Sequence, residues 1–305
     1  MRILFAGTPQ VAVASLDELR RAGHEVVAVL TRTDAPVGRK RVLTPSPVAA
    51  AAADAGLEII KANRIDEPVV ARLADLKLDA AAVVAYGGLV PPSALRIPRH
   101  GWVNLHFSLL PAWRGAAPVQ HALINGDDIT GASTFLLEEG LDTGPVFGTL
   151  TERVLPDDTS GALLDRLSIS GAVLLAQTMS ALEQGRARPV PQEGEVTLAP
   201  KLSSADGRIR WSDPALAVKR RISGVTPEPG AWTMLDGQRC KLGAVILRPD
   251  VSDVAPGTVT EKDGAVLVGT GSHAVQLGGI QPAGRKPLSA AEWFRGVRGQ
   301  ELSFS

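Results

Sequence analysis

The first 85 residues alternate between short apolar runs and longer amphipathic stretches, and this alternation constrains the fold more than any other feature of the sequence. Runs of β-branched and small apolar residues, typical of buried strands, lie at 2–6, 25–30, 58–60 and 79–85. Stretches with helical periodicity lie between them, at 11–21, 47–55 and 66–76. Strands that alternate with helices predict an α/β domain with a Rossmann-like, doubly wound parallel sheet.

The remainder of the chain has a different texture. Residues 190–206 are rich in proline and polar residues and show little periodicity, so we expect a linker there. Short β-like runs separated by Gly, Asp and Pro follow at 230–247, 257–260, 265–269 and 274–277. Runs of this length and spacing predict a small barrel or sandwich. We therefore expect a first domain at 1–189 and a second, smaller β-domain at 207–305.

Several functional classes lose support. The turn after the first apolar run holds a single glycine, Gly7, whereas the dinucleotide fingerprint needs G-x-G-x-x-G, and no phosphate-loop motif occurs. We therefore expect no nucleotide cofactor. The histidines show no i,i+4 spacing and Cys240 is the single cysteine, so we expect no metal site and no internal disulfide. No apolar stretch suits a signal peptide or a membrane span, which predicts a cytoplasmic protein without a membrane partner.

A polar pair stands at the end of another apolar run. In an extended strand, residues two apart point to the same face, so Asn104 and His106 project together while Val103 and Leu105 face the core. The run breaks at Ser108–Pro111, which places the pair near the carboxyl end of a strand, where open α/β sheets bind ligands. A lone histidine would more often be a hydrogen-bonded core residue; the pairing and the position favour a catalytic role.

A third polar residue, Asp142, lies in the turn-rich sequence Gly140–Pro145, after the strand-like run Ala132–Leu137. On the residues alone, an ordinary Asx turn is the better explanation of this aspartate. In a functional role it would hold His106 in one tautomer or raise its basicity. The three residue types suit acyl transfer to an amine, because a histidine assisted by a carboxylate can manage the proton while Asn104 stabilises the oxyanion.

Two motifs together resemble the signature of the 10-formyltetrahydrofolate-dependent formyltransferase family. They are Asn104-x-His106-x-Ser108-Leu109-Leu110-Pro111 and Leu141-Asp142-Thr143-Gly144. The resemblance implies that Asn104, His106 and Asp142 are catalytic and that 10-formyltetrahydrofolate is the co-substrate, with no metal. The folate contacts that it implies are made by Ser108, Leu109, Leu110, Pro111, Tyr86 and Gly87.

Further matches extend the resemblance from residue 5 to residue 284 and favour the tRNA-directed branch of this family. They are Phe5–Pro9, Pro45–Val48, Val84–Gly87, Trp113–Pro118 and Gln281–Gly284. The resemblance implies that the second domain is an OB-like β-barrel that binds tRNA.

The distribution of charge bears on the same question. Residues 1–200 hold 18 Lys and Arg against 22 Asp and Glu, a net charge of −4, whereas residues 201–305 hold 14 against 10, a net charge of +4. This asymmetry fits a nucleic-acid partner, and chance variation of the surface explains it equally well. By resemblance, the basic loop 31–43 enters the acceptor end of the tRNA. The expected tRNA-binding residues are Arg39, Lys40, Arg41, Lys201, Arg208, Arg210, Lys219, Arg220, Arg285 and Lys286.

The function implied by the resemblance is formyl transfer from 10-formyltetrahydrofolate to the α-amine of methionyl-initiator-tRNA, by a monomer that contacts the acceptor stem. Three alternatives remain open. A formyltransferase for a small amine would share the first domain, and a formyltetrahydrofolate hydrolase would use the same three residues on water. Neither has an evident use for a basic second domain. A non-catalytic RNA-binding protein is the third alternative, and the intact Asn/His/Asp set weighs against it.

Overall fold

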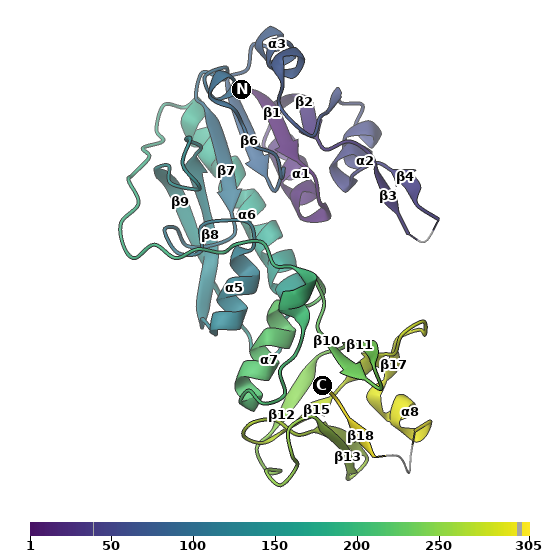
Figure 1. Cartoon of the computed structure of the whole chain (residues 1–305). Helices are drawn as coiled ribbons and strands as arrows, with labels where there is room; N and C mark the ends of the chain where they lie inside the picture. The colour runs from purple at the N-terminus through teal and green to yellow at the C-terminus, as the bar shows by residue number, and fades with distance from the viewer. Residues whose placement is uncertain (39, 298–300) are drawn as a thin grey trace. The chain divides into compact units, whose positions relative to one another are not determined.

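The structure is a computed structural model that describes residues 1–38, 40–297 and 301–305. Two units can be followed along the chain by colour in Figure 1. Unit 1 comprises Met1–Gly115, Ile129–Arg153 and Leu164–Leu198, and unit 2 comprises Ala116–Asp128, Val154–Leu163 and Ala199–Ser305. The division is more interleaved than the predicted boundaries, because two short segments before residue 190 pack with the C-terminal part. The first half of the predicted linker, as far as Leu198, belongs to unit 1.

Unit 1 is built on a seven-stranded sheet with the strand order β5-β2-β1-β6-β7-β8-β9. The parallel strands are β1 (Arg2–Gly7), β2 (Glu25–Thr31), β5 (Ile59–Lys61), β6 (Ala80–Val84) and β7 (Trp102–His106). The antiparallel strands are β8 (Ile129–Leu136) and β9 (Val146–Arg153). The connection 137–145 between β8 and β9 is too short for the helical crossover that parallel pairing requires. The predicted α/β fold is confirmed, with a mixed sheet in place of a wholly parallel one.

Several helices are associated with this sheet, and two of them begin after a capping side chain. The helices are η1 (Gln10–Ala12), α1 (Val13–Arg21), α2 (Pro47–Asp54), α3 (Glu67–Asp75), α4 (Pro92–Leu95) and most of α6 (Ser160–Glu183). The Ser46 hydroxyl accepts a hydrogen bond from the Ala49 N–H at the start of α2, and the Asp66 carboxylate accepts one from the Val69 N–H at the start of α3. Leu4, Leu30 and Ala81 of the central strands are fully buried and form part of the core of unit 1.

The basic loop 31–43 folds as a hairpin of β3 (Ala35–Val37) and β4 (Val42–Thr44), which extends beyond α2 in Figure 1. Arg39 lies outside the described residues. Lys40 and Arg41 lie in the turn and are exposed. Paired strands give this basic segment a defined backbone that the sequence analysis did not predict.

Unit 2 carries two antiparallel sheets, with the strand orders β10-β11-β16-β17 and β12-β15-β14-β13-β18. Their strands are β10 (Trp232–Leu235), β11 (Gln238–Leu242), β12 (Val245–Arg248), β13 (Thr258–Lys262), β14 (Ala265–Val268), β15 (Ala274–Leu277), β16 (Gly279–Gln281), β17 (Leu288–Ser289) and β18 (Leu302–Ser303). Its helical elements are α5 (Pro118–Asn125), η2 (Ser204–Gly207), α7 (Ala215–Gly224) and α8 (Ala290–Arg295). The predicted strand-rich second domain is confirmed.

The interleaving has a packing reason. Helix α5 lies against α7, where Gly224 lets the two backbones approach: a Cβ at this position would stand 2.9 Å from the Gln120 carbonyl oxygen. Stacked aromatic rings add to the core of unit 2, with Phe304 between Trp211 and Trp293 at centroid distances of 5.6 and 5.9 Å. Throughout the described ranges, no helix combines the length and the apolarity that a membrane span requires.

Candidate active site

Asn104 and His106 lie near the carboxyl end of β7, as predicted. Strand β7 pairs with β6 on one side and with β8 on the other, and Asn104 stands opposite Val83 and Phe135 in the ladder. The flanking Val103 and Leu105 are fully buried, whereas Asn104 is half-buried. Its amide makes no hydrogen bond to any side chain or backbone group in the described ranges, so both its donors remain available to a ligand.

The tautomer of His106 follows from its partners. Its Nε2 atom lies 2.8 Å from the carbonyl oxygen of Trp113. A carbonyl oxygen only accepts, so Nε2 carries the proton and Nδ1 of the neutral ring holds the lone pair. Nδ1 in turn faces the Asp142 carboxylate, with 3.8 Å between Nδ1 and Oδ2. The structure therefore brings the predicted histidine and aspartate together.

Burial sets the charge state of His106. The side chain is 6% exposed, and removal from water lowers its pKa from 6.5; the Asp142 carboxylate and the hydrogen bond to Trp113 act in the opposite direction. His106 is consequently neutral at pH 7, with its lone pair directed to the side where Asp142 would stabilise an added proton. A neutral ring with a free nitrogen next to a carboxylate is equipped to act as a base.

The loop that carries Asp142 doubles back along β7. Because β8 is antiparallel to β7, it ends opposite Val103, three residues before His106 and about 10 Å away at a strand rise of ~3.3 Å per residue. Asp142 has a positive φ of 50°, and its Oδ2 accepts a hydrogen bond from the Gly115 N–H at 2.7 Å. The carboxylate therefore contacts the turn after Pro111 while it faces the histidine.

The turn at 113–115 has an unfavourable backbone conformation. Trp113 has φ 60°, a left-handed conformation that costs a bulky residue about 1–3 kcal/mol. This conformation directs the Trp113 carbonyl at His106, while Gly115, with φ 125°, directs its N–H at Asp142. Such strain persists where surrounding contacts enforce it, and functional sites are where it concentrates.

The predicted folate segment Ser108–Pro111 follows β7 directly. Ser108 is fully buried and its hydroxyl donates to the Ala112 carbonyl at 2.6 Å, so this side chain shapes the loop. Ser133 of β8 fixes the same loop, since its hydroxyl donates to the Ser108 carbonyl and accepts from the Leu110 N–H. Leu109 and Leu110 are half-buried, and Pro111 is buried.

Tyr86 and Gly87, the other predicted folate residues, follow β6. The Tyr86 ring is buried and its hydroxyl donates to the Ala62 carbonyl at 2.9 Å, while its own carbonyl accepts from the Thr8 hydroxyl at 2.9 Å. The Gly87 carbonyl accepts from Arg32 at 2.6 Å. Leu89 follows on this loop and is 91% exposed, and Leu141, beside Asp142, is 61% exposed.

The predicted tRNA-binding residues have different surroundings. Lys201, Arg208, Arg210, Arg285 and Lys286 are exposed. Of these, Arg210 pairs with Asp213 at 3.2 Å and Arg208 lies over the Trp232 ring at 5.7 Å from its centroid. Lys219 lies 3.4 Å from Asp157, and Arg220 donates to the carbonyls of Asn125 and Gly126.

Two basic residues that the sequence analysis did not select lie on β11. The Arg239 guanidinium stacks over Trp232 at 4.3 Å from the ring centroid, and Lys241 is exposed on the same strand. The sequence signal that could have identified them is their spacing of two residues along one predicted strand, which places both side chains on the same face.

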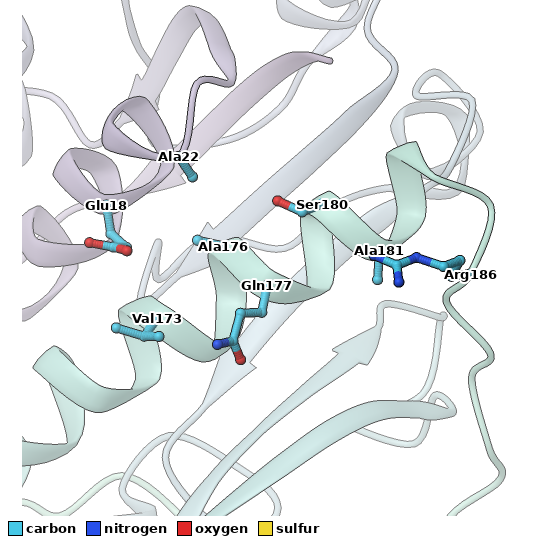
Figure 2. Close-up of a pocket in the computed structure, with 8 residues that line it drawn as sticks. All are labelled: Glu18, Ala22, Val173, Ala176, Gln177, Ser180, Ala181 and Arg186. Carbon is cyan, nitrogen blue, oxygen red and sulfur yellow. The ribbon is translucent and has the colours of Figure 1, made fainter.

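A hollow of about 340 Å³ lies between α1 and α6, away from these residues (Figure 2). It is lined by Glu18 and Ala22 on one side and mainly by small side chains of α6 on the other, and Glu18 is paired with Arg21. None of the predicted site residues lines it. Among the described residues, no group of three or more His, Cys, Asp or Glu side chains is placed to hold a metal ion.

Comparison with known proteins identifies relatives of both parts of the chain. Residues 1–179 match the family described as "Formyl transferase", and residues 201–298 match "Formyl transferase, C-terminal domain". The methionyl-tRNA formyltransferase of Arthrobacter sp. (strain FB24) is 69% identical over 296 residues, which cover 97% of each chain.

Solved structures share the fold at low sequence identity. HypX from Aquifex aeolicus in complex with tetrahydrofolic acid superposes with a TM-score of 0.68 at 19% identity over 98% of this chain, which spans 48% of the length of HypX. The N-formyltransferase from Helicobacter canadensis, in complex with folinic acid and dTDP-3-aminofucose, superposes with a TM-score of 0.69 at 14% identity, over 92% of this chain and 98% of its own.

Proposed function

Because the chain belongs to the formyl transferase family, we propose that it transfers the formyl group of 10-formyltetrahydrofolate to the α-amine of methionyl-initiator-tRNA. The observation that carries this proposal is the buried neutral His106, with Nδ1 facing Asp142, two residues from the unpaired amide of Asn104. The names of its relatives support the tRNA acceptor, and the folates bound to its structural neighbours support the co-substrate. The enzyme acts in the cytoplasm, where initiator tRNA is charged.

The chemistry assigned to each residue follows from its partners. The α-amine attacks the formyl carbon, and the carbonyl oxygen becomes an oxyanion that the Asn104 amide stabilises by hydrogen bonding. His106 Nδ1 takes the proton that the amine loses, and the imidazolium is stabilised by Asp142. When the bond between the formyl carbon and N10 of the folate breaks, the same proton passes to N10, which leaves formylmethionyl-tRNA, tetrahydrofolate and a neutral His106.

Exposed basic residues support the second part of the proposal, that the acceptor is a tRNA. The β3–β4 hairpin presents Lys40 and Arg41, and unit 2 presents Arg208, Arg239 and Lys241. Contacts from such side chains to phosphates provide salt-dependent affinity and orientation rather than sequence reading. This role distinguishes the chain from an enzyme that formylates a small amine.

The test is formyl transfer from 10-formyltetrahydrofolate to methionyl-initiator-tRNA, with uncharged tRNA and tRNA-free reactions as controls. We expect product that requires the charged tRNA and that is lost in His106→Ala. Folate turnover without tRNA would instead support hydrolysis or a small amine acceptor, and binding of tRNA without turnover would support a non-catalytic RNA-binding protein.

A further inference from the structure

Residues 190–198, from the segment expected to be a linker, run along unit 1 as a continuous strap. At one end Val190 exchanges two backbone hydrogen bonds with Val146 at the start of β9, each 2.8 Å long. At the other end the Thr197 carbonyl accepts from the Arg114 N–H at 2.9 Å. The strap thus joins the strand that follows the Asp142 loop to the turn that contacts His106.

Gln192, in the middle of the strap, holds the loop that bears the carboxylate. Its Nε2 donates to the carbonyl of Asp142 and to that of Gly144, both at 2.8 Å. Its Oε1 accepts from Nη2 and Nε of Arg114, at 2.7 and 3.1 Å. One amide side chain therefore connects the Asp142 loop to the 113–115 turn, with both ends of the amide satisfied.

Thr197 holds the turn itself. Its hydroxyl oxygen accepts a hydrogen bond from the Trp113 N–H at 2.8 Å. Trp113 is the residue with the strained, left-handed backbone whose carbonyl accepts from His106 Nε2. The Thr197 contact therefore stabilises the conformation that fixes the tautomer of the histidine.

We propose that Gln192 and Thr197 are positioning residues, through which the strap holds Asp142 and the Trp113 carbonyl on opposite nitrogens of His106. This inference rests on the proposed function, because it assigns the strap a role in the same formyl transfer. The need for a strap follows from topology: β8 delivers the Asp142 loop at the far end of β7, so contacts outside the sheet must hold the carboxylate at the histidine. Both act through other residues: Gln192 through the carbonyls of Asp142 and Gly144, and Thr197 through the Trp113 N–H.

The surroundings of His106 make this role measurable without substrate. Asp142 is the charged group that faces the ring; the other neighbours, the Phe135 ring of β8 and the Trp113 carbonyl, carry no net charge. The two groups held by the strap both raise the pKa of His106 against the effect of burial. If the Asp142 carboxylate or the Trp113 carbonyl moves away from the ring, the pKa of His106 should therefore fall further.

The test compares matched substitutions in the full-length enzyme. Gln192→Glu keeps an oxygen for Arg114 and removes the donor to both loop carbonyls, whereas Gln192→Ala removes both interactions. Thr197→Val removes the hydroxyl at nearly constant shape, and Thr197→Ser keeps it. Glu195→Gln and Val196→Thr, at exposed strap positions, serve as controls.

We expect kcat to fall roughly 10- to 100-fold in Gln192→Ala, Gln192→Glu and Thr197→Val, because a displacement of about 1 Å suffices for such losses. The KM for 10-formyltetrahydrofolate stays within about twofold of the wild-type value. Thr197→Ser and both controls retain wild-type kcat. A Gln192→Glu enzyme with wild-type kcat, or losses confined to KM or to the melting temperature, would overturn the proposal.

Titration of the His106 ring by NMR provides the second readout. The expected result is a lower pKa in Gln192→Ala and Thr197→Val than in the wild type, with no change in Thr197→Ser. An unchanged His106 pKa in both loss variants would overturn the positioning role. This readout needs no acceptor: a wild-type enzyme inactive on methionyl-initiator-tRNA would sink the proposed function, while the titration would still decide the role of the strap.

Discussion

The end of β7 and the basic surfaces contribute to the proposed reaction in physically different ways. His106 is buried, and each of its ring nitrogens faces a specific partner, Trp113 on one side and Asp142 on the other. Lys40 and Arg41 are exposed on a hairpin turn. The first region depends on a few unscreened contacts at short range, and the second on several charges that water and salt attenuate.

This difference predicts how each region responds to substitution. Where burial removes water, the loss of one partner changes both the geometry and the charge state of the remaining group. Where side chains are exposed, each contributes a small increment to affinity, and neighbouring charges compensate in part. Large effects on kcat should therefore come from the end of β7, and modest, salt-dependent effects on KM from the basic surfaces.

The largest loss is expected from His106→Ala and Asn104→Ala. Removal of the base or of the oxyanion donor should lower kcat about 10²- to 10³-fold, with the melting temperature close to that of the wild type for the half-buried Asn104. Single-turnover formylation measures the rate, and a thermal melt provides the control. An Asn104→Ala enzyme that loses only affinity for folate would show that the amide binds the co-substrate rather than the transition state.

Asp142→Asn should give a smaller loss, about 10²-fold in kcat, since asparagine can still accept from the Gly115 N–H but carries no charge to stabilise the imidazolium. Because the carboxylate raises the pKa of His106, its removal should also move the acid limb of the kcat profile to lower pH. Profiles of wild type and variant, recorded side by side, would show this shift. An acid limb at the same pH in both enzymes would mean that Asp142 acts only through the Gly115 contact.

Modest effects are expected on the basic surfaces. Lys40→Ala and Arg41→Ala should each raise the KM for methionyl-initiator-tRNA a few-fold, and the effect should diminish as salt increases. Arg220→Gln should instead lower stability by about 0.5–1.5 kcal/mol, because Arg220 bonds to the carbonyls of Asn125 and Gly126. Steady-state kinetics at two salt concentrations and urea denaturation separate the two outcomes. Equal effects of Arg41→Ala and Arg220→Gln on the KM for tRNA would show that exposed Arg41 and hydrogen-bonded Arg220 do not differ in their roles as proposed.

Much of unit 1 was predictable because its signals are local. The strands β1, β2 and β6 are apolar runs, and α2 and α3 follow the N-cap residues Ser46 and Asp66, each with a proline in the first helical turn. The direction of β8 was less accessible, because its connection to β7, residues 107–128, contains α5 and is long enough for either a parallel or an antiparallel pairing.

The residues of the candidate site also differ in whether a local sequence pattern predicts them. Asn104 and His106 share a face of one strand, so alternation alone pairs them. Asp142 reaches them only because its loop doubles back. The side chain that holds this loop is Gln192, 50 residues further along the chain, and the turn at Trp113 is held by Thr197. A polar residue in a proline-rich segment carries no periodic signal, so these partners could not be recognised before the fold was known.

The pH dependence of the single-turnover formylation rate, measured between about pH 5 and pH 8, shows whether neutral His106 is the base. Neutral His106 is the proposed base, and burial lowers its pKa below 6.5. We therefore expect a rate that rises with pH through a transition below pH 6.5 and is level above it, with the transition at still lower pH in Asp142→Asn. A rate that falls as pH rises through this range would require protonated His106 in the chemical step and would contradict its role as the base.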